Sequence, residues 1–534
     1  MTLPRFTKNI TFATRLILLS LLFMPLLSWA WPEKQQVWGL VGSFGGAGDD
    51  GVGAAKTDAH GNIYMTGFFS ATAKFQGKVL VSYGDADIYL AKFNPHGHLL
   101  WIVQAGGVGL DEGTDLAFDA DGNVYITGWF SDNATFGSAD GTSETVTGYV
   151  HENIFLAKYS PHGKLIWLRT GGNPVFYDGN NRAWGLTVNP REGTVYITGY
   201  AEGTTLFSTT VGPDQAVTGS DPWHIYLVKY DTEGNFQWGV TNWAEGNSIA
   251  YKVALDKYGN AYVVGWFEEV AIFRSKNGKD QMVGGFSLPG GPDYADDAFL
   301  VKYDCNGNLK WVNHAGGYKA IANNLAVSDK GEVSITGLVG NLNDEFPAQA
   351  VTIVSSQPGG TDIDLGGGQG SYNWDAFIAT FNEAGVLKRA SRIGGPSQDF
   401  GAGITYDCQG NLYLTGVFSG AVDFGGVTLN GTAPFNVFVA KYTFEPRHSK
   451  NWRLVWAKLA VGAGTIAAYQ ETGPRVWVDE SRCWREKRTD GHTLIVTGIY
   501  QGTATFGRFT LNSAGVDDIY LLKLHQEERN EDHP

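Results

Sequence analysis

Hydrophobic and polar residues alternate in two short motifs that recur in the same order along the chain. The first is a Gly-rich turn followed by an alternating segment that ends near Thr-Gly, as in GNIYMTG at Gly61–Gly67 and GNVYITG at Gly122–Gly128. The second is an alternating segment such as DIYLAKF at Asp87–Phe93. A period of two places one set of side chains on each face of an extended strand, so both motifs predict β-strands.

A third motif is a Trp-centred segment that usually leads to Gly-Gly. Its anchors are Trp101, Trp167, Trp238, Trp311 and Trp456. The fifth copy has Arg389 in place of the tryptophan, and no copy follows Leu524. The missing copy stands instead near the N-terminus, as VWGLVGSFGG with Trp38, before any copy of the first two motifs.

One further short segment precedes each first motif, so each unit contains four strands, which we letter a to d. Seven such units follow one another at intervals of about 60 to 80 residues, a spacing typical of stacked repeats. Twisted four-stranded sheets that stack radially form a β-propeller. The displaced strand at Trp38 predicts how the ring closes: it would lie beside Asp518–Leu524 and complete the last sheet, which removes the free edge. The expected fold is therefore all-β, a closed seven-bladed β-propeller of antiparallel sheets.

The ends of the chain differ from the repeats. Arg5, Lys8 and Arg15 precede an apolar run from Leu16 to Leu27 and then Ser28-Trp29-Ala30, which is typical of a secretory signal peptide. We expect residues 1–30 to be the signal peptide with cleavage near Ala30, residues 31–525 to be one propeller domain, and residues 526–534 to be a polar tail. The mature chain is then expected to be secreted or periplasmic.

Composition narrows the function classes. The chain has 534 residues, 72 of them glycine, and 13% aromatic residues, which suits many strands and turns and not a coiled coil. Its formal net charge of −15 disfavours nucleic acid and anionic membranes as partners. HExxH, GxSxG, P-loop and dinucleotide-binding motifs do not occur in the sequence.

The repeated run "GN-x-Y-x-TG … D-[AI]-[FY]-[LIV]-[AV]-K-[YF] … G-x-x-x-W … GG" resembles bacterial secreted proteins built of SBBP-type propeller repeats, over nearly the whole mature chain. The resemblance implies the fold and export, and little about activity. The fifth unit departs most from the pattern, at Ser334, Thr380 and Arg389. The same run also resembles quinoprotein and outer-membrane assembly-factor propellers, although those usually have eight blades and quinoprotein dehydrogenases often carry adjacent cysteines, which are absent here.

Two charged positions recur in the repeats. A lysine occupies the c strand at Lys92, Lys158, Lys229, Lys302, Lys441 and Lys523. An Asp or Asn closes the a strand at Asp58, Asp119, Asn189, Asp256, Asp329, Asp407 and Asp479. Because a catalytic centre needs one site and this pattern runs around the whole ring, we interpret it as a structural ion pair or turn cap.

The opposite end of the ring, formed by the d–a and b–c connections, is the expected binding face. Eight residues before the a-strand Asp, carboxylates occur at Asp50, Asp111, Asp399 and Glu471, in units adjacent around a closed ring. Clustered carboxylates would suit Ca²⁺, a polyhydroxy ligand or a cationic ligand at the mouth of the channel. The alternative is that each Asp only closes a Gly-rich loop.

The longest b–c connections, Glu268–Asp296 and Val339–Trp374, lie on the same expected face. Long loops on a rigid ring often carry specificity. Tyr294, Tyr372 and Trp374 could stack on sugars or grip a peptide. The alternative is that these segments are elaborated hairpins without a ligand.

The three cysteines, Cys305, Cys408 and Cys483, allow one disulfide at most. Cys408 and Cys483 are expected in neighbouring a–b turns and form the candidate pair, which would leave Cys305 free.

The sequence therefore favours an exported, non-catalytic propeller that binds a protein or glycan, with no certain cofactor. The alternatives are a carbohydrate-active enzyme that uses two carboxylates at the channel mouth as acid and base, and a quinoprotein-like or assembly-factor-like propeller. A structural Ca²⁺ is a further hypothesis.

Overall fold

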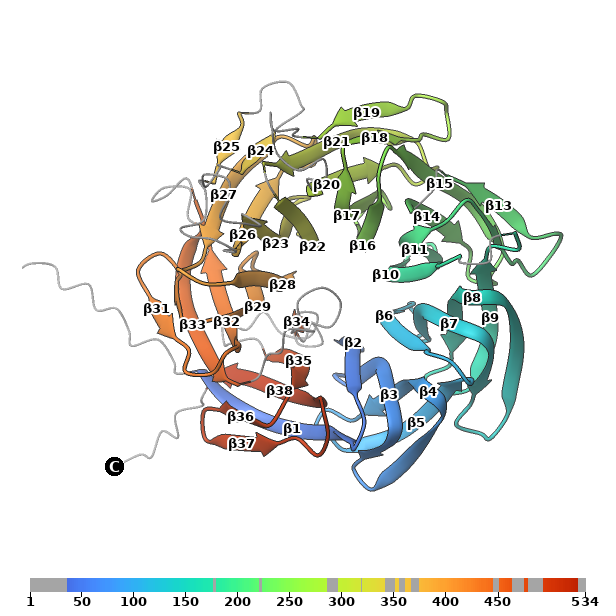
Figure 1. Cartoon of the computed structure of the whole chain (residues 1–534), viewed down its shortest axis with the longest axis horizontal. Coiled ribbons are helices and arrows are strands. Elements are labelled where there is room, and N and C mark those ends of the chain that lie inside the picture. The colour runs from blue at the N-terminus through green and yellow to red at the C-terminus, as the bar shows by residue number, and fades with distance from the viewer. Residues whose placement is uncertain are drawn as a thin grey trace, which may run out of the picture.

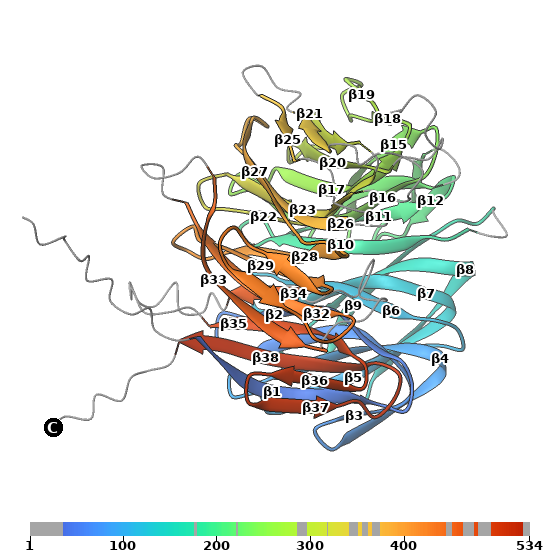
Figure 2. The same ribbon diagram turned by 60° about the vertical axis from the view of Figure 1, so that its left-hand side comes forward.

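A computed structural model describes residues 36–175, 179–219, 223–285, 296–317, 319–340, 351–354, 361–365, 374–444, 451–462, 475–478 and 493–526. The predicted signal peptide at 1–30 and the residues after Gln526 lie outside this range. Every regular element within it is a β-strand. Figure 1 shows these strands grouped around a common centre, and Figure 2 shows the same groups from the side.

The strands pair antiparallel in repeating groups of four, numbered here as units in chain order. Unit 1 contains β2(Asp50–Thr57), β3(Ile63–Phe75), β4(Lys78–Phe93) and β5(Leu99–Gly106). Unit 2 contains β6(Glu112–Phe118), β7(Val124–Gly137), β8(Ser143–Tyr159) and β9(Leu165–Gly172). Unit 3 contains β10(Arg182–Asn189), β11(Thr194–Ala201), β14(His224–Tyr230) and β15(Phe236–Ala244).

The same a-to-d order continues in the second half of the chain. Unit 4 contains β16(Ser248–Leu255), β17(Ala261–Glu268), β20(Asp296–Tyr303) and β21(Leu309–Gly316). Unit 5 contains β22(Lys319–Val327), β23(Val333–Gly340), β26(Trp374–Phe381) and β27(Leu387–Ile393). Unit 6 contains β28(Asp399–Tyr406), β29(Leu412–Phe418), β32(Asn436–Thr443) and β33(Arg453–Val461).

The last unit combines both ends of the described chain. Its a, b and c strands are β34(Arg475–Val478), β35(Leu494–Tyr500) and β38(Asp518–Gln526). Its fourth strand is β1(Gln36–Gly46), which pairs with β38 in a register that places Trp38 opposite Leu524 and Phe44 opposite Ile519. The pairing predicted for the Trp38 segment is thus confirmed, and β38 lies beside β1 in Figure 1.

Each b–c connection carries a two-stranded hairpin that leans on the preceding unit. In units 1 and 2 it is formed by the ends of β3 and β4 and of β7 and β8. The separate hairpins are β12(Thr204–Phe207)–β13(Gln215–Thr218), β18(Val270–Phe273)–β19(Gln281–Gly284), β24(Thr352–Val354)–β25(Ile363–Asp364), β30(Ala421–Asp423)–β31(Thr428–Asn430) and β36(Thr503–Phe506)–β37(Phe509–Asn512). They pair with the d strand of the unit before, as β18 does with β15. The two long b–c connections are therefore elaborated hairpins in their described parts.

The a strands share a register shift that adds one residue relative to the b strand. The extra residues are Gly53, Thr114, Trp184, Tyr251, Asn323 and Ala402. Such a bulge increases the local twist and redirects a side chain. The alternating strand residues form buried clusters of Val, Ile, Leu, Phe and Tyr between neighbouring units, for example around Leu116, Ile126 and Phe155.

Candidate functional site: the channel mouth

The a–b and c–d turns form one face of the ring, called here the lower face, and they carry the repeated charges. Asp58 accepts hydrogen bonds from the backbone N–H groups of His60 and Asn62, both at 2.9 Å, and so closes its turn. The Lys92 ammonium lies 3.9 Å from Asp58 and 4.8 Å from the centre of the Tyr64 ring. Corresponding ion pairs are Lys158–Asp119, Lys302–Asp256 and Lys441–Asp407. Both parts of the structural interpretation, the cap and the ion pair, are present.

The same lysines also join neighbouring units. Lys92 Nζ and Trp101 Nε1 both donate to the Pro161 carbonyl of unit 2, at 3.0 and 3.2 Å. Three further pairs donate in this way to the next c–d turn: Lys158 and Trp167 to Thr232, Lys229 and Trp238 to Cys305, and Lys302 and Trp311 to Glu383. Lys523 donates to Pro95, from the last unit to the first. We call this contact the Lys/Trp latch.

Unit 5 departs from this pattern in two ways. The residue that closes its a strand is Ser328, whose hydroxyl accepts the Glu332 N–H at 3.1 Å, so the expected Asp329 was wrong by one position. The sequence alignment missed this because the a strand of unit 5 has an Asp directly after the capping position. The Lys and Trp of the latch are replaced by Thr380 and Arg389, and Trp452 of unit 6 donates back to Thr380 at 3.0 Å. The direction of the latch is reversed at this junction.

The acids predicted at the channel mouth are buried. Asp50, Asp111 and Asp399 are at most 1% exposed. Each accepts a hydrogen bond from the N–H of a glycine four residues earlier, at 2.6 to 2.7 Å, from Gly46, Gly107 and Gly395. This is the loop-closing role that the sequence left as the alternative. The three side chains lie buried in three different junctions between units, and Glu471, the fourth acid of the expected arc, lies outside the described residues.

Each of these acids faces a second carboxylate that sequence reasoning missed. Asp87, Asp375 and Asp518, which open the second motif in units 1, 5 and 7, oppose Asp111, Asp399 and Asp50 respectively. A Cβ on Gly106 would collide with both Asp87 and Asp111, so the Gly-Gly of the third motif allows the two carboxylates to approach. The available signal was the Asp that opens most copies of the second motif.

Burial and like charge make these pairs hard to ionise. Burial raises the pKa of Asp50 and of Asp111 to about 7, and that of Asp399 to about 8, and the facing carboxylates add to each shift. The buried Oδ1 atoms of Asp87 and Asp518 accept no hydrogen bond from any described residue. A proton held between the two carboxyl groups would satisfy both oxygens.

The described residues contain no group of three or more His, Cys, Asp or Glu side chains that could hold a metal ion. Glu471, the fourth acid of the Ca²⁺ hypothesis, lies outside them, as do Tyr294 and Tyr372. The expected disulfide is not seen: Cys408 is an exposed free thiol, and Cys483 lies outside the described residues. Cys305 is free, as expected.

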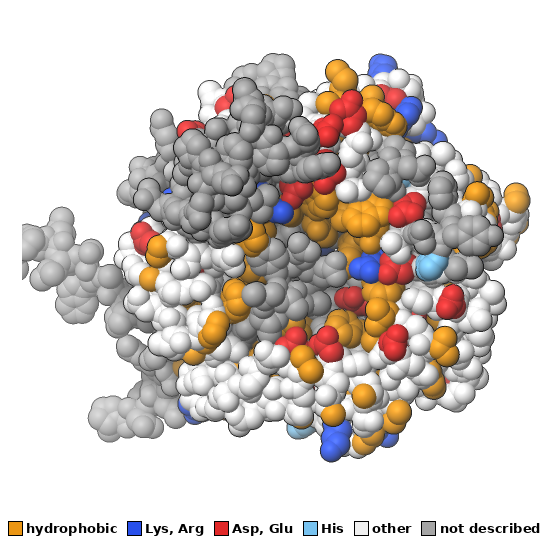
Figure 3. Space-filling view, viewed as in Figure 1, with side chains coloured by type: hydrophobic (Ala, Val, Ile, Leu, Met, Phe, Trp, Pro, Cys, Tyr) orange, Lys and Arg blue, Asp and Glu red, His pale blue; other side chains and the backbone are white. Residues whose placement is uncertain are grey.

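The opposite face, called here the upper face, carries the d–a and b–c connections, and its inner positions differ from unit to unit. Cross-strand pairs at the start of a and the end of b are Gly51–Phe68, Glu112–Trp129, Arg182–Tyr200, Ile249–Trp266, Ile321–Leu338 and Phe400–Val417. Units 2 to 4 therefore carry Trp, Tyr and charges where units 5 and 6 are apolar. Figure 3 shows this face hollowed at its centre, with hydrophobic side chains inside and Asp and Glu around them.

Five aromatic side chains of units 3 and 4 gather at this mouth, and we call them the aromatic sector: Trp184, Tyr200, Trp223, Tyr251 and Trp266. Trp184 and Tyr251 are the bulge residues of their a strands, and their rings meet edge to face at 6.1 Å. Trp266 Nε1 donates to the Tyr251 hydroxyl at 3.1 Å, and Trp223 Nε1 donates to Glu202 at 2.7 Å. Tyr251, Trp266 and Trp223 remain partly exposed.

Two ion pairs flank the aromatic sector. Arg182 forms a two-pronged pair with Glu152, at 2.6 Å for both bonds, and lies 4.3 Å from the centre of the Trp129 ring. Lys319 pairs with Asp296 at 2.8 Å and lies 6.0 Å from the ring of Trp374, the described member of the three predicted aromatic residues. Trp374 is the first residue of β26, at the end of the b–c connection of unit 5, and its role in binding stays a prediction.

Deeper in the ring, Asp115 of unit 2 contacts three other units. It pairs with Lys252 of unit 4 at 2.6 Å and with Lys56 of unit 1 at 3.3 Å. It also accepts the Leu186 N–H of unit 3 at 2.8 Å. Burial alone would raise the pKa of Asp115, but the two lysines outweigh burial and lower it. This buried charge cluster holds the a strands of four units together.

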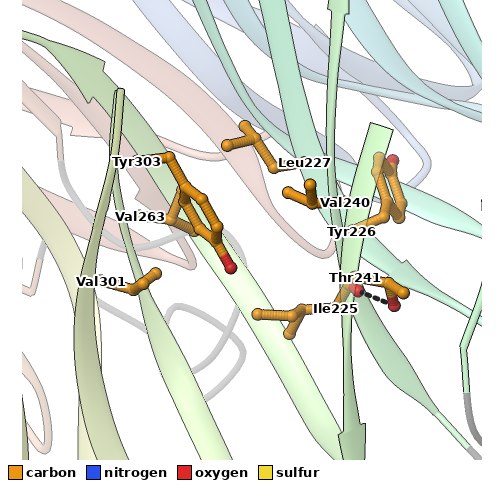
Figure 4. A pocket seen from close by; sticks show the side chains of 8 residues that line it. All are labelled: Ile225, Tyr226, Leu227, Val240, Thr241, Val263, Val301 and Tyr303. Carbon is orange, nitrogen blue, oxygen red and sulfur yellow. Dashed lines mark hydrogen bonds between the residues drawn. The ribbon is translucent and has the colours of Figure 1, made fainter. Parts of the chain in front are cut away.

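A small apolar gap lies between units 3 and 4, lined by side chains that include Ile225, Leu227, Val263 and Tyr303 (Figure 4). Its one drawn hydrogen bond joins Thr241 to the Ile225 carbonyl, at 2.8 Å. The lining is the packing seam of two sheets and offers no charged group to a ligand.

These units, strand orders and turns are those of a β-propeller repeat protein. No family model matches the chain. The chain is similar to the uncharacterized WD repeat-containing protein L264 of Acanthamoeba polyphaga mimivirus, 24% identical over 446 residues, which cover 71% of this chain and 31% of the relative. The chain thus spans about a third of the length of that curated relative.

Two solved structures are also similar. Sqt1 from Chaetomium thermophilum is 10% identical with a TM-score of 0.33, covering 91% of this chain and 99% of that one. A puromycin hydrolase is 11% identical with a TM-score of 0.24, covering 73% and 58%. Among the described residues, no helix is long and apolar enough to cross a membrane.

Proposed function

We propose that this chain is an exported, non-catalytic, seven-bladed propeller that binds a protein partner at the mouth of its upper face. Closure of the ring is supported by one pairing that completes the last unit from the N-terminal end of the described chain, and by two contacts between the last and first units. These are the β1–β38 pairing, the β1–β3 pairing and the hydrogen bond from Lys523 to Pro95. Export is supported by the signal-peptide pattern of residues 1–30, and the protein would act in the periplasm or outside the cell.

The observation that carries the binding proposal is the difference between units at equivalent positions. Residues that recur in most units, such as those of the Lys/Trp latch, serve the fold that the units share. The aromatic sector occurs in units 3 and 4 and leaves Tyr251, Trp266 and Trp223 partly exposed. A rigid ring that presents partly exposed aromatic side chains at its centre is suited to binding a partner.

The buried acids favour binding over hydrolysis. A glycosidase needs two carboxyl groups that reach the substrate. Asp50, Asp111 and Asp399 are closed off from solvent and hydrogen-bonded to their own loops. They therefore support a structural role at the junctions.

The test is selection of a displayed random-peptide library on the purified mature protein. We expect enriched peptides to lose binding in the double variant Tyr251→Leu/Trp266→Leu, which keeps apolar volume at the mouth and removes two aromatic faces. The matched control is Tyr258→Leu, because Tyr258 is 59% exposed in an a–b turn of the lower face. Peptides that bind the double variant as well as the wild type would contradict the proposal.

A further inference from the structure

The residues at the mouth of the upper face indicate the chemistry of the partner. This inference rests on the function proposed above. The indole N–H groups of two partly exposed rings already donate hydrogen bonds within the protein. Trp266 Nε1 donates to Tyr251 and Trp223 Nε1 donates to Glu202. These bonds fix the ring planes, and the Tyr200 ring packs against Trp223 at 5.0 Å between ring centres. The parts of the ring faces that remain exposed carry negative charge and are the surface offered to a ligand.

The charged side chains around the mouth are mostly acidic, which also favours a cationic ligand. The two basic side chains that flank the aromatic sector, Arg182 and Lys319, are each held by a carboxylate at 2.6 and 2.8 Å. Further acids stand on the neighbouring d–a and b–c connections of the described chain: Asp49, Asp85, Asp132, Glu202, Glu245, Glu268 and Glu269. Figure 3 shows acidic side chains around the hollow. A cationic ligand would meet an attractive field there, and an anionic ligand would be repelled.

The aromatic sector contains one buried hydrogen-bond donor, the indole N–H of Trp184. Trp184 is 7% exposed, and its indole N–H has no hydrogen-bond partner among the described residues. A buried N–H without an acceptor is costly, so a bound group that supplies an acceptor oxygen would be favoured. A polypeptide offers such an acceptor in every backbone carbonyl, beside the side chain that carries the positive charge.

We infer that the mouth of the upper face binds a basic segment of a partner protein. An Arg or Lys side chain of that segment lies on the partly exposed parts of Tyr251, Trp266 and Trp223. Arg182 on Trp129, at 4.3 Å, shows that this mouth already accommodates a guanidinium on an indole. Arginine is the better ligand, because its planar guanidinium stacks on aromatic faces.

The experiment measures the affinity of labelled oligoarginine, oligolysine and oligoglutamate peptides of equal length by fluorescence anisotropy over a series of salt concentrations. We expect oligoarginine to bind most tightly and oligoglutamate not to bind. Tyr251→Leu/Trp266→Leu should weaken oligoarginine binding about tenfold, since the cation–π contact is lost while the acids remain. Glu202→Gln keeps an acceptor for Trp223 and should weaken binding a few-fold at low salt.

The controls are Tyr258→Leu and Glu233→Gln, which make the same changes on the lower face and should leave the affinity unchanged. Circular dichroism and thermal melting establish that each variant is folded. Oligoarginine binding that is unaffected by the double leucine variant would overturn the inference, because it would be nonspecific attraction to an acidic protein. Equal binding of oligoglutamate would overturn it as well.

The two proposals fail in different ways. If library peptides depend on Tyr251 and Trp266 but carry no positive charge, the mouth is a binding site and the cationic partner is wrong. If neither the library nor the oligoarginine depends on these residues, both proposals are wrong.

Discussion

The lower and upper faces of the ring are built from the same repeats and have diverged to different degrees. On the lower face, the Lys/Trp latch recurs at successive junctions with nearly the same atoms and distances. On the upper face, equivalent inner positions hold Trp129, Tyr200 and Trp266 in units 2 to 4 but Leu338 and Val417 in units 5 and 6. Contacts shared by the units join neighbouring sheets, and differences between the units define the proposed site.

In unit 5, the residues that form the junction on the lower face differ from those of the other units, although the junction still contains an indole and a cation. Thr380 and Arg389 replace the Lys and Trp of the latch, and Trp452 of the next unit supplies an indole from the opposite direction. Arg389 lies 4.6 Å from the Trp452 ring and pairs with Glu332 at 2.6 Å. The junction keeps one indole and one cation, so different residues provide similar packing there.

The largest effect is expected from removing β1. Deletion of Gln36–Gly46 removes the d strand of the last unit and exposes the edge of β38 along its whole paired length. We expect the cooperative thermal transition to be lost, as measured by calorimetry. Deletion of residues 527–534, which follow β38, is the control and should leave the transition in place. A β1-deleted protein that melts normally would contradict the closed ring.

The next effect separates the two faces directly. Trp238→Ala removes a latch indole that is 6% exposed and donates to Cys305. We expect the free energy of unfolding to fall by about 3 to 5 kcal/mol, the usual cost of truncating a buried tryptophan. Trp266→Leu at the mouth should cost less stability, because Leu retains part of the apolar contact. Urea unfolding of both variants measures the difference, and equal losses would remove the distinction between the faces.

A smaller effect depends on pH. The folded pKa of Asp399 is raised to about 8, by burial first and then by the facing Asp375, which Arg392 approaches at 3.2 Å. A raised carboxyl pKa favours folding at low pH, and that contribution is lost as the pH rises through 8. We expect this group to lower stability by at most about 1.4 kcal/mol per pH unit between the unfolded and folded pKa values.

Asp399→Asn tests this account, because an amide cannot ionise. Its stability should depend less on pH between 6 and 9 than that of the wild type, as measured by urea unfolding. Asp140→Asn is the control, because Asp140 is exposed in the turn between β7 and β8, and it should retain the wild-type slope. An unchanged slope in Asp399→Asn would show that the carboxyl pair does not hold its proton near neutral pH.

The smallest effect is expected from removing calcium. The predicted acids are divided among three junctions and bound to backbone N–H groups, which leaves Ca²⁺ little to coordinate. We expect the melting temperature to be the same in EGTA and in excess Ca²⁺. A clear rise with Ca²⁺ would restore the hypothesis of a structural ion, with Glu471 as a further ligand.

Several features of the molecule followed from local pattern. Alternation with a period of two identified the b and c strands, since each strand shows one face to the core. The displaced Trp38 segment identified its own partner, because an unpaired last sheet would leave an open edge. The recurring Lys and Asp positions were correctly interpreted as structural, because chemistry does not require the same pair at each junction.

The positions of the acids could not be settled in this way. Asp50, Asp111 and Asp399 share a place in the repeat, and counting along the chain does not say whether that place faces solvent or the next unit. Their partners Asp518, Asp87 and Asp375 come from another sheet, so the pairing exists only after the units pack. The one-residue error at Ser328 has the same origin, since two adjacent polar residues are equivalent until the turn forms.

The chain alone determined that it would fold into repeated four-stranded sheets and which segment would complete the last one, because backbone pairing and side-chain alternation are local properties of each motif. Only the tertiary structure decided which side chains share the mouth. Trp184, Tyr251 and Trp266 come from different strands and carry no common motif, and the bulges that redirect Trp184 and Tyr251 exist only once the a and b strands have paired.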